Sequence, residues 1–349
     1  MEFRKLGRTD LSVSAICLGT MTFGQQTSEA EGFAQMDLAV EQGINFFDTA
    51  EMYSIPPRAE TYGATEKIIG AWLKKRGKRD DLIIASKISG RSTMNWLRPD
   101  GAMARLDRKN IFYAIEGSLQ RLGTDYIDLY QLHWPDRPMD LFDGLSNSYH
   151  DRGGLDGVTF EETLGALNEL VQQGKIRHVG VSNETPWGVG QFLRAAEAGQ
   201  GPRLASIQNA YHLLNRQFEI GLAEYALREQ VGLLAYSPLA QGFLTGKYLH
   251  GAKPAGARST LFDRGQRYQK PGVDEAIEDY LALAKQLGFD PVHLAVAYVT
   301  SRPFVTANII GARNLEQLKI ILASQDVVIT SEIEQAIDAI HQIRGNPAP

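Results

Sequence analysis

Eight short apolar segments alternate with helix-like segments along this 349-residue sequence. Within each segment the apolar residues are nearly continuous, as expected for parallel strands that are buried on both faces. This alternation, with no break in composition, predicts one domain over residues 1–349 that folds as a (β/α)8 TIM barrel. The eight predicted strands are Ala15–Thr20, Ile44–Thr49, Leu82–Lys87, Ile127–His133, Ile176–Ser182, Ala205–Asn209, Val231–Ser237 and Val305–Gly311.

Local signals place several elements around these strands. Thr159 and Glu162 have the spacing of a capping box, which predicts a helix that begins there. Gly123 follows an amphipathic stretch and is placed to end a helix in the left-handed conformation. Residues 1–13 are expected to form a β-hairpin that plugs the barrel floor. Residues 331–344 are expected to form an extra C-terminal helix.

The composition limits the environment and the partners of the chain. It has 36 Lys and Arg against 41 Asp and Glu, a net charge of −5, which argues against a nucleic-acid partner held through its phosphates. Cys17 is the only cysteine and lies in an apolar run, so a buried thiol and no disulfide are expected. The sequence shows no signal-peptide core and no apolar run that could cross a membrane. We therefore expect a cytoplasmic protein; no sequence feature indicates its oligomeric state.

Three connections are too long to be simple turns, at residues 89–108, 134–158 and 238–273. Each follows a predicted strand, so in a barrel all three open on the C-terminal face, where ligands bind. The third connection is rich in cations, and two interpretations are open. It is either a solvated surface, the usual fate of a charge run, or a mobile cover that supplies cations to a phosphate-bearing ligand. Its cations are Lys247, Lys253, Arg258, Arg264 and Arg267.

Four polar residues stand at or just after the ends of predicted strands: Asp48, Tyr53, Lys87 and His133. Each alone is more simply explained as a capping, packed or surface residue. Because neighbouring barrel strands bring their C-terminal ends together, all four side chains are expected to meet. A Lys87 cation beside Tyr53 would ease loss of the phenolic proton, and Asp48 would keep Lys87 charged. A neutral His133 would hold a carbonyl oxygen against the Tyr53 hydroxyl.

Other common kinds of site are not indicated. The sequence has no P-loop, and Leu193 stands where the third glycine of a Rossmann motif would follow Gly188 and Gly190. Glu184 replaces the final glycine of a nucleophile elbow, which argues against a serine hydrolase. No pair of histidines has the spacing of a shared metal site, so no metal is expected.

Six short motifs carry a resemblance to a known family. They are Gly19-Thr-Met-Thr-Phe-Gly24, Phe47-Asp48-Thr-Ala-Glu-Met-Tyr53, Ser86-Lys87, Asp128-Leu-Tyr-Gln-Leu-His133-Trp-Pro135, Gly180-Val-Ser-Asn183 and Tyr236-Ser-Pro-Leu239. These motifs resemble those of the aldo-keto reductases, over nearly the whole chain. The resemblance implies a barrel that binds NADPH without a Rossmann domain. It also implies hydride transfer to the carbonyl carbon of an aldehyde or ketone, reversibly with alcohols.

The resemblance also implies roles for the residues. Tyr53 becomes the general acid, Lys87 lowers its pKa, Asp48 pairs with Lys87, and His133 orients a small-molecule carbonyl substrate. For NADPH or NADP+, the nicotinamide would lie against Ser182, Asn183, Gln208 and Tyr236. The pyrophosphate would lie against Ser237, Pro238, Leu239, Gln241, Gly242 and Lys247. The ribose 2′-phosphate would lie against Arg258, Gly311, Arg313 and Gln317. Further cofactor contacts are implied at Gly19, Thr20, Met21 and Asp48.

Aromatic or soft side chains on the face loops are candidates for the substrate pocket, and they suit an apolar or aromatic carbonyl compound. One position departs from the family pattern. Many relatives have an asparagine near the adenine where this chain has Ile321, preceded by Ile320. The pocket candidates are Phe23, Met52, Trp96 and Trp134.

Three other functions are open at this point. The potassium-channel β-subunit relatives in the same family keep the four polar residues, so an NADPH-binding redox sensor or partner-binding subunit without turnover is the main alternative. A metal-dependent barrel isomerase or lyase would need several convergent carboxylates or histidines, which the sequence does not show. An NAD-linked catabolic dehydrogenase would show no preference for NADPH over NADH.

Overall fold

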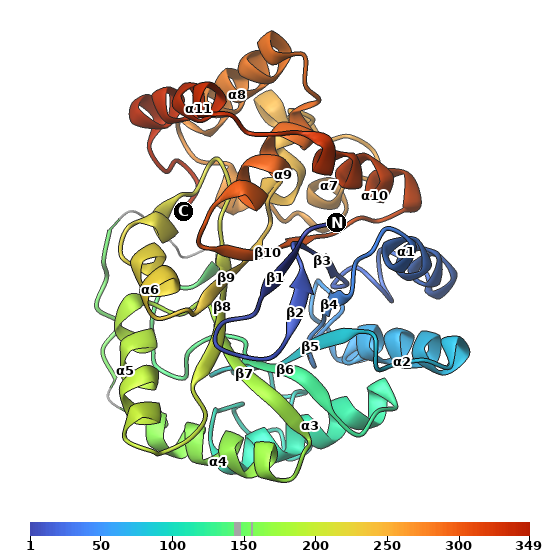
Figure 1. Ribbon diagram of the computed structural model, residues 1–349, viewed down its shortest axis with the longest axis vertical. Helices are drawn as coiled ribbons and strands as arrows, with labels where there is room; N and C mark the ends of the chain where they lie inside the picture. The colour runs from blue at the N-terminus through green and yellow to red at the C-terminus, as the bar shows by residue number, and fades with distance from the viewer. Residues whose placement is uncertain (143–147, 155) are drawn as a thin grey trace.

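The computed structural model describes residues 1–142, 148–154 and 156–349, and it shows a closed barrel of eight parallel strands (Figure 1). The first and last barrel strands, β3 and β10, pair through Cys17 and Ile309, which closes the sheet. The predicted (β/α)8 TIM barrel is therefore confirmed. The strands are β3 Ile16–Gly19, β4 Phe46–Asp48, β5 Ile83–Ile88, β6 Ile127–Leu132, β7 Ile176–Ser182, β8 Leu204–Ala210, β9 Gly232–Tyr236 and β10 Val305–Ile310.

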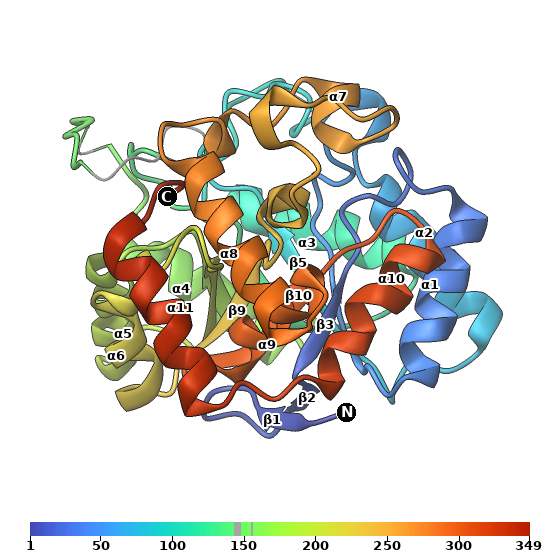
Figure 2. The same cartoon turned by 90° about the horizontal axis from the view of Figure 1, so that it is seen from above.

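A small antiparallel hairpin closes the N-terminal end of the barrel. Strands β1 (Phe3–Lys5) and β2 (Ser12–Ser14) form it, and Figure 2 shows it at the end opposite α7. Leu6 and Val13 are buried against the barrel interior. Gly7 has φ of +58°, and a Cβ there would lie 2.4 Å from the carbonyl oxygen of Ala205, so only glycine fits this close approach. The predicted floor plug is confirmed.

Helices surround the barrel and connect its strands. The Thr159 hydroxyl accepts a hydrogen bond from the Glu162 amide at 3.2 Å, which caps α4 as predicted. The Glu162 carboxylate accepts from the Arg108 amide of the neighbouring helix α3, at 3.5 Å. Gly123 ends α3 with φ of +64°. The connecting helices are α1 Glu29–Glu41, α2 Ala64–Arg76, α3 Arg108–Leu122, α4 Phe160–Gln172, α5 Pro186–Glu197, α6 Leu222–Arg228, α8 Val273–Leu287, α9 Pro291–Ser301 and α10 Leu315–Leu322.

The C-terminal segment forms one further helix, α11 (Ser331–Arg344), as predicted. It packs beside α8, with Ile333 and Ile337 buried in the core. Arg344 forms an ion pair with Asp279 of α8 at 2.6 Å. The helix therefore covers the outside of the barrel wall.

The core has two parts, which follow from the alternation of side chains along each strand. One face of the strands packs against the helices, and it carries Phe47 and Ile84. The other face fills the barrel interior, and it carries Cys17, Phe46 and Ala85. The expected buried thiol of Cys17 is confirmed.

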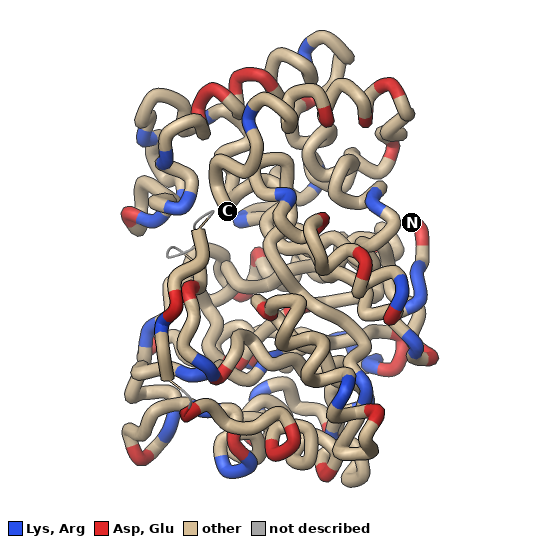
Figure 3. Tube along the Cα trace, turned by 90° about the vertical axis from the view of Figure 1, so that its left-hand side faces the viewer, with Lys and Arg blue, Asp and Glu red and all other residues tan. Residues whose placement is uncertain are grey.

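The three long connections all leave C-terminal strand ends. The connection after β9 holds a short helix, α7 (Arg258–Phe262), and several 3-10 turns, and Figure 2 shows α7 beyond the barrel end. Residues 143–147 and 155 of the predicted 134–158 loop lie outside the described residues. Positively charged Lys and Arg and negatively charged Asp and Glu are both spread along the trace (Figure 3). In the part of the chain that the structure describes, no helix combines the length and apolar character that a bilayer span requires.

Candidate active site

A polar layer lies at the C-terminal end of the barrel interior. Side chains two residues apart on a strand share a face, so the interior positions Phe46 and Ala85 are followed by Asp48 and Lys87. The register places β4 and β5 side by side, with Asp48 opposite Ala85. The apolar barrel filling therefore ends in a layer of buried polar groups, at the end where barrel ligands bind.

Asp48 and Lys87 form a buried ion pair at the centre of this layer. Lys87 Nζ donates to Asp48 Oδ2 at 2.6 Å and to the Thr49 carbonyl oxygen at 2.8 Å. Asp48 Oδ1 accepts from the amides of Gln131 at 3.1 Å and Gln208 at 2.8 Å. Burial opposes the charge of Lys87, but the neighbouring Asp48 carboxylate raises its pKa above the ordinary value. Lys87 is therefore held as a cation.

Tyr53 lies next to this pair on the loop after β4. Lys87 Nζ is 5.0 Å from the centre of the Tyr53 ring, and the tyrosine is 8% exposed. Burial raises the pKa of Tyr53, and the charge of Lys87 opposes this rise. Lys87 lowers the pKa of Tyr53, as expected, but burial raises this pKa by more than Lys87 lowers it. Tyr53 therefore keeps its phenolic proton at neutral pH, as a proton donor must.

His133 faces Tyr53 from the end of β6. The two ring centroids are 5.5 Å apart and the planes meet at 78°, an edge-to-face arrangement. Burial and the charge of Lys87 hold the pKa of His133 well below its usual value, so the imidazole is neutral. His133 Nδ1 is buried and has no hydrogen-bond partner among the described residues. The structure thus brings all four predicted residues together.

The predicted nicotinamide residues lie beside His133. Asn183 Nδ2 donates to the His133 carbonyl oxygen at 2.8 Å and to Ser182 Oγ at 3.1 Å. The Tyr236 hydroxyl donates to Asn183 Oδ1 at 2.7 Å, and Ser182 Oγ donates to the Gln208 carbonyl oxygen at 2.7 Å. The structure therefore gathers these residues at the ends of β7, β8 and β9, one strand after another around the barrel.

The segment after β9 has an unusual backbone. Ser237, Ala240 and Gln241 have φ between +49° and +60°, and Gly242 has φ of +94°. A Cβ at Gly242 would lie 2.9 Å from Lys247 Nζ. Runs of left-handed residues expose backbone amides that can bind anions, and such strain is concentrated at functional sites. The segment contains the predicted residues Ser237, Pro238, Leu239, Gln241 and Gly242. Sequence reasoning missed Ala240, since alanine gives no local signal for a positive φ.

Cations from the third loop gather near this segment. Burial lowers the pKa of Lys247 and of Arg258, which is the behaviour of cations without a carboxylate partner. Arg313 donates to the Gly256 carbonyl oxygen, so it reaches this loop from the start of α10. Among the described residues, Lys247 and Arg258 form no ion pair, and Arg258 Nε is buried without a partner. These contacts favour a cover over a solvated surface.

The remaining cofactor candidates lie around the β3–β10 seam. A Cβ at Gly19 would meet Ile309 Cγ2 at 2.7 Å, and a Cβ at Gly311 would lie 3.6 Å from the Gly19 carbonyl oxygen. Thr20 Oγ1 donates to the Asp48 carbonyl oxygen at 2.8 Å. Met21 is half-buried against the cluster that contains Tyr53. These residues therefore form a wall beside the polar layer.

The start of α10 carries the other positions. The Gln317 side chain accepts from the Arg313 amide at 3.0 Å, which orders the turn that carries Arg313. Ile321 is buried in the main core, whereas Ile320 is 45% exposed. The departure from the family pattern at Ile321 therefore places an apolar side chain in the core.

Three of the four pocket candidates lie together. Met52, Trp134 and Trp96 belong to one apolar cluster with Tyr53. Phe23 lies apart from them: it is fully buried in the main core, with its ring against Gly32 of α1. The structure therefore does not bring Phe23 to the pocket. Sequence reasoning missed the other cluster members, because their roles depend on the paths of irregular loops. These members include Ile55, Tyr62, Met94, Leu97, Leu141 and Phe142.

Among the described residues, no group of three or more His, Cys, Asp or Glu side chains could hold a metal ion. The residues around the polar layer are suited instead to a dinucleotide. The buried Nδ1 of the neutral His133 is open to a ligand in the polar layer, and the unpaired Arg258 and Lys247 offer positive charge in the loop after β9. The donor set therefore fits a nicotinamide at one end and phosphates at the other.

Comparison with known proteins agrees with this geometry. The model of the aldo/keto reductase family matches residues 15–342. Protein tas of Escherichia coli strain K12 is 50% identical over the whole of both chains. Uncharacterized oxidoreductase YrpG of Bacillus subtilis strain 168 is 34% identical over 100% of this chain and 98% of its own. A probable voltage-gated potassium channel subunit beta of Arabidopsis thaliana is 29% identical over 97% of each chain. This chain therefore belongs to the aldo/keto reductase family of oxidoreductases.

Proposed function

We propose that the protein is an NADP(H)-dependent reductase of aldehydes and ketones, reversible with alcohols, in which Tyr53 is the general acid. The observation that carries this proposal is the arrangement of Tyr53 between a buried Lys87 cation and a neutral His133. When bound, NADPH supplies the hydride that the carbonyl carbon accepts. The protein's own residues supply the proton and hold the carbonyl in place.

The proton comes from the Tyr53 hydroxyl. As the carbonyl oxygen gains negative charge, the phenol donates its proton and becomes a phenolate. The Lys87 ammonium stabilises this phenolate, and Asp48 holds the ammonium in place through the 2.6 Å contact. His133 is neutral, so it can donate one hydrogen bond to the carbonyl oxygen without competing as an acid.

The cover and the strained segment would hold the cofactor. Lys247 and the backbone amides around Gly242 would bind the pyrophosphate, and Arg313 with Arg258 would bind the ribose 2′-phosphate. The 2′-phosphate contact would select NADPH over NADH, which separates this proposal from an NAD-linked dehydrogenase. The lone buried thiol of Cys17 is consistent with a reducing, cytoplasmic setting.

A second function has support from the relatives. A protein named as a probable potassium channel subunit beta matches almost the whole chain. An NADPH-binding sensor or partner-binding subunit would use the same barrel and bind the cofactor without rapid turnover. The two functions differ in one measurable property, the rate of carbonyl reduction.

The test is a turnover assay with a reactive aromatic aldehyde such as 4-nitrobenzaldehyde. A reductase consumes NADPH only when the aldehyde is present, and one alcohol forms per NADPH oxidised. NADPH binding is measured on the same sample, from the quenching of the protein's intrinsic fluorescence. Tight binding with negligible reduction across aromatic and aliphatic carbonyls would reject the reductase proposal and favour the sensor. Unchanged turnover in EDTA would also exclude a metal-dependent reaction.

A further inference from the structure

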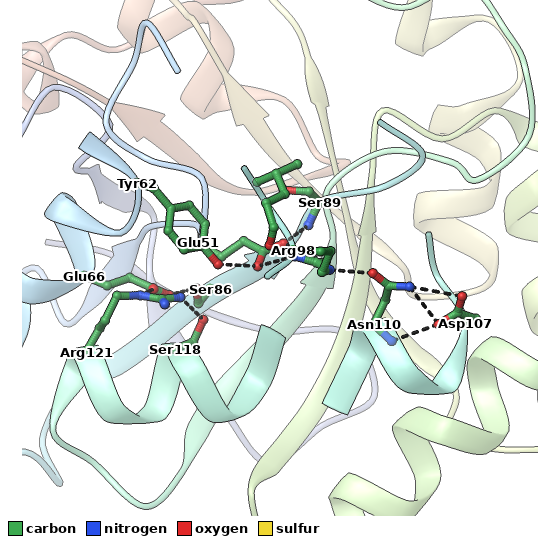
Figure 4. A network of polar contacts seen from close by, with 11 residues as sticks. Glu51, Tyr62, Glu66, Ser86, Ser89, Arg98, Asp107, Asn110, Ser118 and Arg121 are labelled. Atoms are coloured by element: carbon green, nitrogen blue, oxygen red, sulfur yellow. Dashed lines mark hydrogen bonds and ion pairs between the residues drawn. The ribbon is translucent and has the colours of Figure 1, made fainter. Parts of the chain in front are cut away.

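A second buried polar cluster lies behind the pocket wall, and the proton transfer proposed above does not use it. Its centre is Glu51, which is fully buried on the loop between Asp48 and Tyr53. Figure 4 shows the Glu51 carboxylate surrounded by Tyr62, Ser89 and Arg98. A buried ion pair is rarely the most stabilising way to fill a core, so its presence calls for a specific role.

Both carboxylate oxygens of Glu51 accept hydrogen bonds. Oε1 accepts from the Ser89 amide at 2.7 Å and from Arg98 Nη2 at 3.3 Å. Oε2 accepts from Arg98 Nη1 at 3.1 Å and from the Tyr62 hydroxyl at 3.1 Å. The Glu51 amide donates to the Lys87 carbonyl oxygen at 3.1 Å. One side chain therefore joins the loop after β4 to the end of β5 and to the loop that follows it.

Arg98 continues the network toward α3. Its Nε donates to Asn110 Oδ1 at 2.5 Å, and its Nη1 donates to the Leu97 carbonyl oxygen at 2.7 Å. The Asn110 amide donates in turn to Asp107, the residue that caps α3. Arg98 is only 5% exposed although it lies in the middle of a long loop. Both ends of the 89–107 loop are thus tied to its centre.

The same loop carries part of the pocket wall. Leu97 is fully buried in the cluster that contains Tyr53, and Trp96 packs beside it. The Tyr62 ring meets the Trp96 ring edge to face, with centroids 5.8 Å apart. Glu51 therefore holds two neighbours of Trp96. It holds Tyr62 through the tyrosine hydroxyl, and it holds Leu97 through Arg98. Loss of either contact would free Trp96 from its position.

From these contacts we infer that Glu51 and Arg98 are positioning residues that fix the Trp96-bearing loop against Tyr53, and so favour aromatic over small aliphatic carbonyl substrates. The inference rests on the proposed function for its substrate class. A flat, rigid wall favours a flat ring, because reacting groups held in place need less ordering on binding. A small aldehyde has little surface to place against this wall and therefore gains little from it.

The main test uses Glu51→Gln, which keeps the shape of the side chain and removes its charge. We expect kcat/KM for 4-nitrobenzaldehyde to fall about tenfold to a hundredfold, because misplacement by about 1 Å has effects of this size. For propanal, we expect kcat/KM to change less than about threefold, because little binding energy comes from the wall. The NADPH dissociation constant should stay within about twofold of the wild-type value, since the cofactor residues are untouched.

Hydrogen exchange gives a readout that does not depend on turnover. The Ser89 amide donates to Glu51, so in Glu51→Gln the peptides that cover residues 89–107 should exchange faster, while peptides from β7 to β9 keep their protection. If Glu51→Gln does not fold, Tyr62→Phe removes one hydrogen bond to Glu51 without a change in charge. It should then give the same pattern, with smaller effects.

The ion pair between Asp128 and Arg79, at the start of β6, provides a matched control. Asp128 is fully buried and accepts from Arg79 at 2.6 Å and from the Ile84 amide at 2.9 Å, and no hydrogen bond, ion pair or ring contact in the described part of the chain joins this pair to Tyr62 or to the 89–107 loop. Arg79→Lys should lower stability yet leave the preference between the two aldehydes unchanged, whereas Arg98→Lys should change that preference. Equal losses for both aldehydes in Glu51→Gln, or unchanged exchange in 89–107, would overturn the inference. If the wild type reduces neither aldehyde, the proposed function fails, and the exchange result alone still decides whether Glu51 holds the loop.

Discussion

Lys87 is a fully buried cation, and the Asp48 carboxylate compensates its charge. Such a pair contributes less to stability than an apolar filling would, but removal of one partner leaves the other charge buried and unpaired. Tyr53 depends on the same pair, since the positive end of the pair faces its ring. Substitutions in this layer are therefore expected to change the unfolding free energy and the turnover to different extents.

Lys87→Met tests this coupling. The variant leaves Asp48 with only amide partners, so we expect it to lose about 3–5 kcal/mol of unfolding free energy. Its turnover should fall by about 10²–10⁴, because the phenolate of Tyr53 loses its stabilising charge. The double variant Asp48→Asn/Lys87→Met should regain most of the stability in chemical denaturation but none of the turnover. A double variant less stable than Lys87→Met would contradict this account of the pair.

Arg313 is expected to determine the choice of cofactor. Arg313→Ala removes a charged contact to the ribose 2′-phosphate, which should weaken NADPH binding by about 1.5–3 kcal/mol. Binding of NADH, which lacks this phosphate, should not change. Lys253 is an exposed cation of the 238–273 loop, which Arg313 contacts at Gly256, so Lys253→Ala serves as the control and should bind both cofactors normally. Equal weakening for NADPH and NADH in Arg313→Ala would argue against the assignment.

Among the elements, those buried on both sides were the most predictable from sequence. The predicted strand Ile176–Ser182 coincides with β7, and the other strands agree within a few residues, because continuous apolar segments mark buried parallel strands. A strong local signal was also enough to place the end of a helix, as Gly123 does for α3. The α7 helix was not predicted, since a five-residue helix leaves no periodic pattern. The Glu51–Arg98 pair was also missed, because charged residues 47 positions apart give no local signal.

The cap of α4 gives a test at the scale of an element. Thr159→Ala removes the acceptor for the Glu162 amide and should lower the unfolding free energy by about 1 kcal/mol. Thr159→Ser keeps the hydroxyl and should stay close to the wild type in thermal unfolding. Because α4 packs on the outside of the barrel, turnover should be unchanged in both variants. A large loss of turnover in Thr159→Ala would show that α4 contributes to the site.

In the whole molecule, the barrel combines an apolar interior with one polar end. The strand alternation that buries Phe46 also delivers Asp48 to the open end, so fold and site have a common origin in the sequence. The four polar residues could therefore be predicted together from their places on the strands. Phe23 could not be placed correctly, because the turn after β3 directs its ring into the core rather than toward the pocket.

Buried histidines make global stability depend on pH. Burial and the nearby Arg267 lower the pKa of His212 from 6.5 to about 3. The unfolded chain binds this proton at a higher pH than the folded chain, so the contribution of His212 is present above pH ~6.5 and is lost as pH falls toward ~3. In His212→Phe, the unfolding free energy should depend less on pH in this window. Parallel pH profiles for the two proteins would contradict a neutral, buried His212.

The most direct test of the role of Tyr53 compares the wild type with Tyr53→Phe in NADPH-dependent reduction of 4-nitrobenzaldehyde. The substitution removes only the phenolic hydroxyl and keeps the ring that faces His133. We expect a fall in kcat of about 10²–10⁴ with an unchanged NADPH dissociation constant. Wild-type turnover in Tyr53→Phe would show that another group donates the proton and would contradict the role of Tyr53 as general acid.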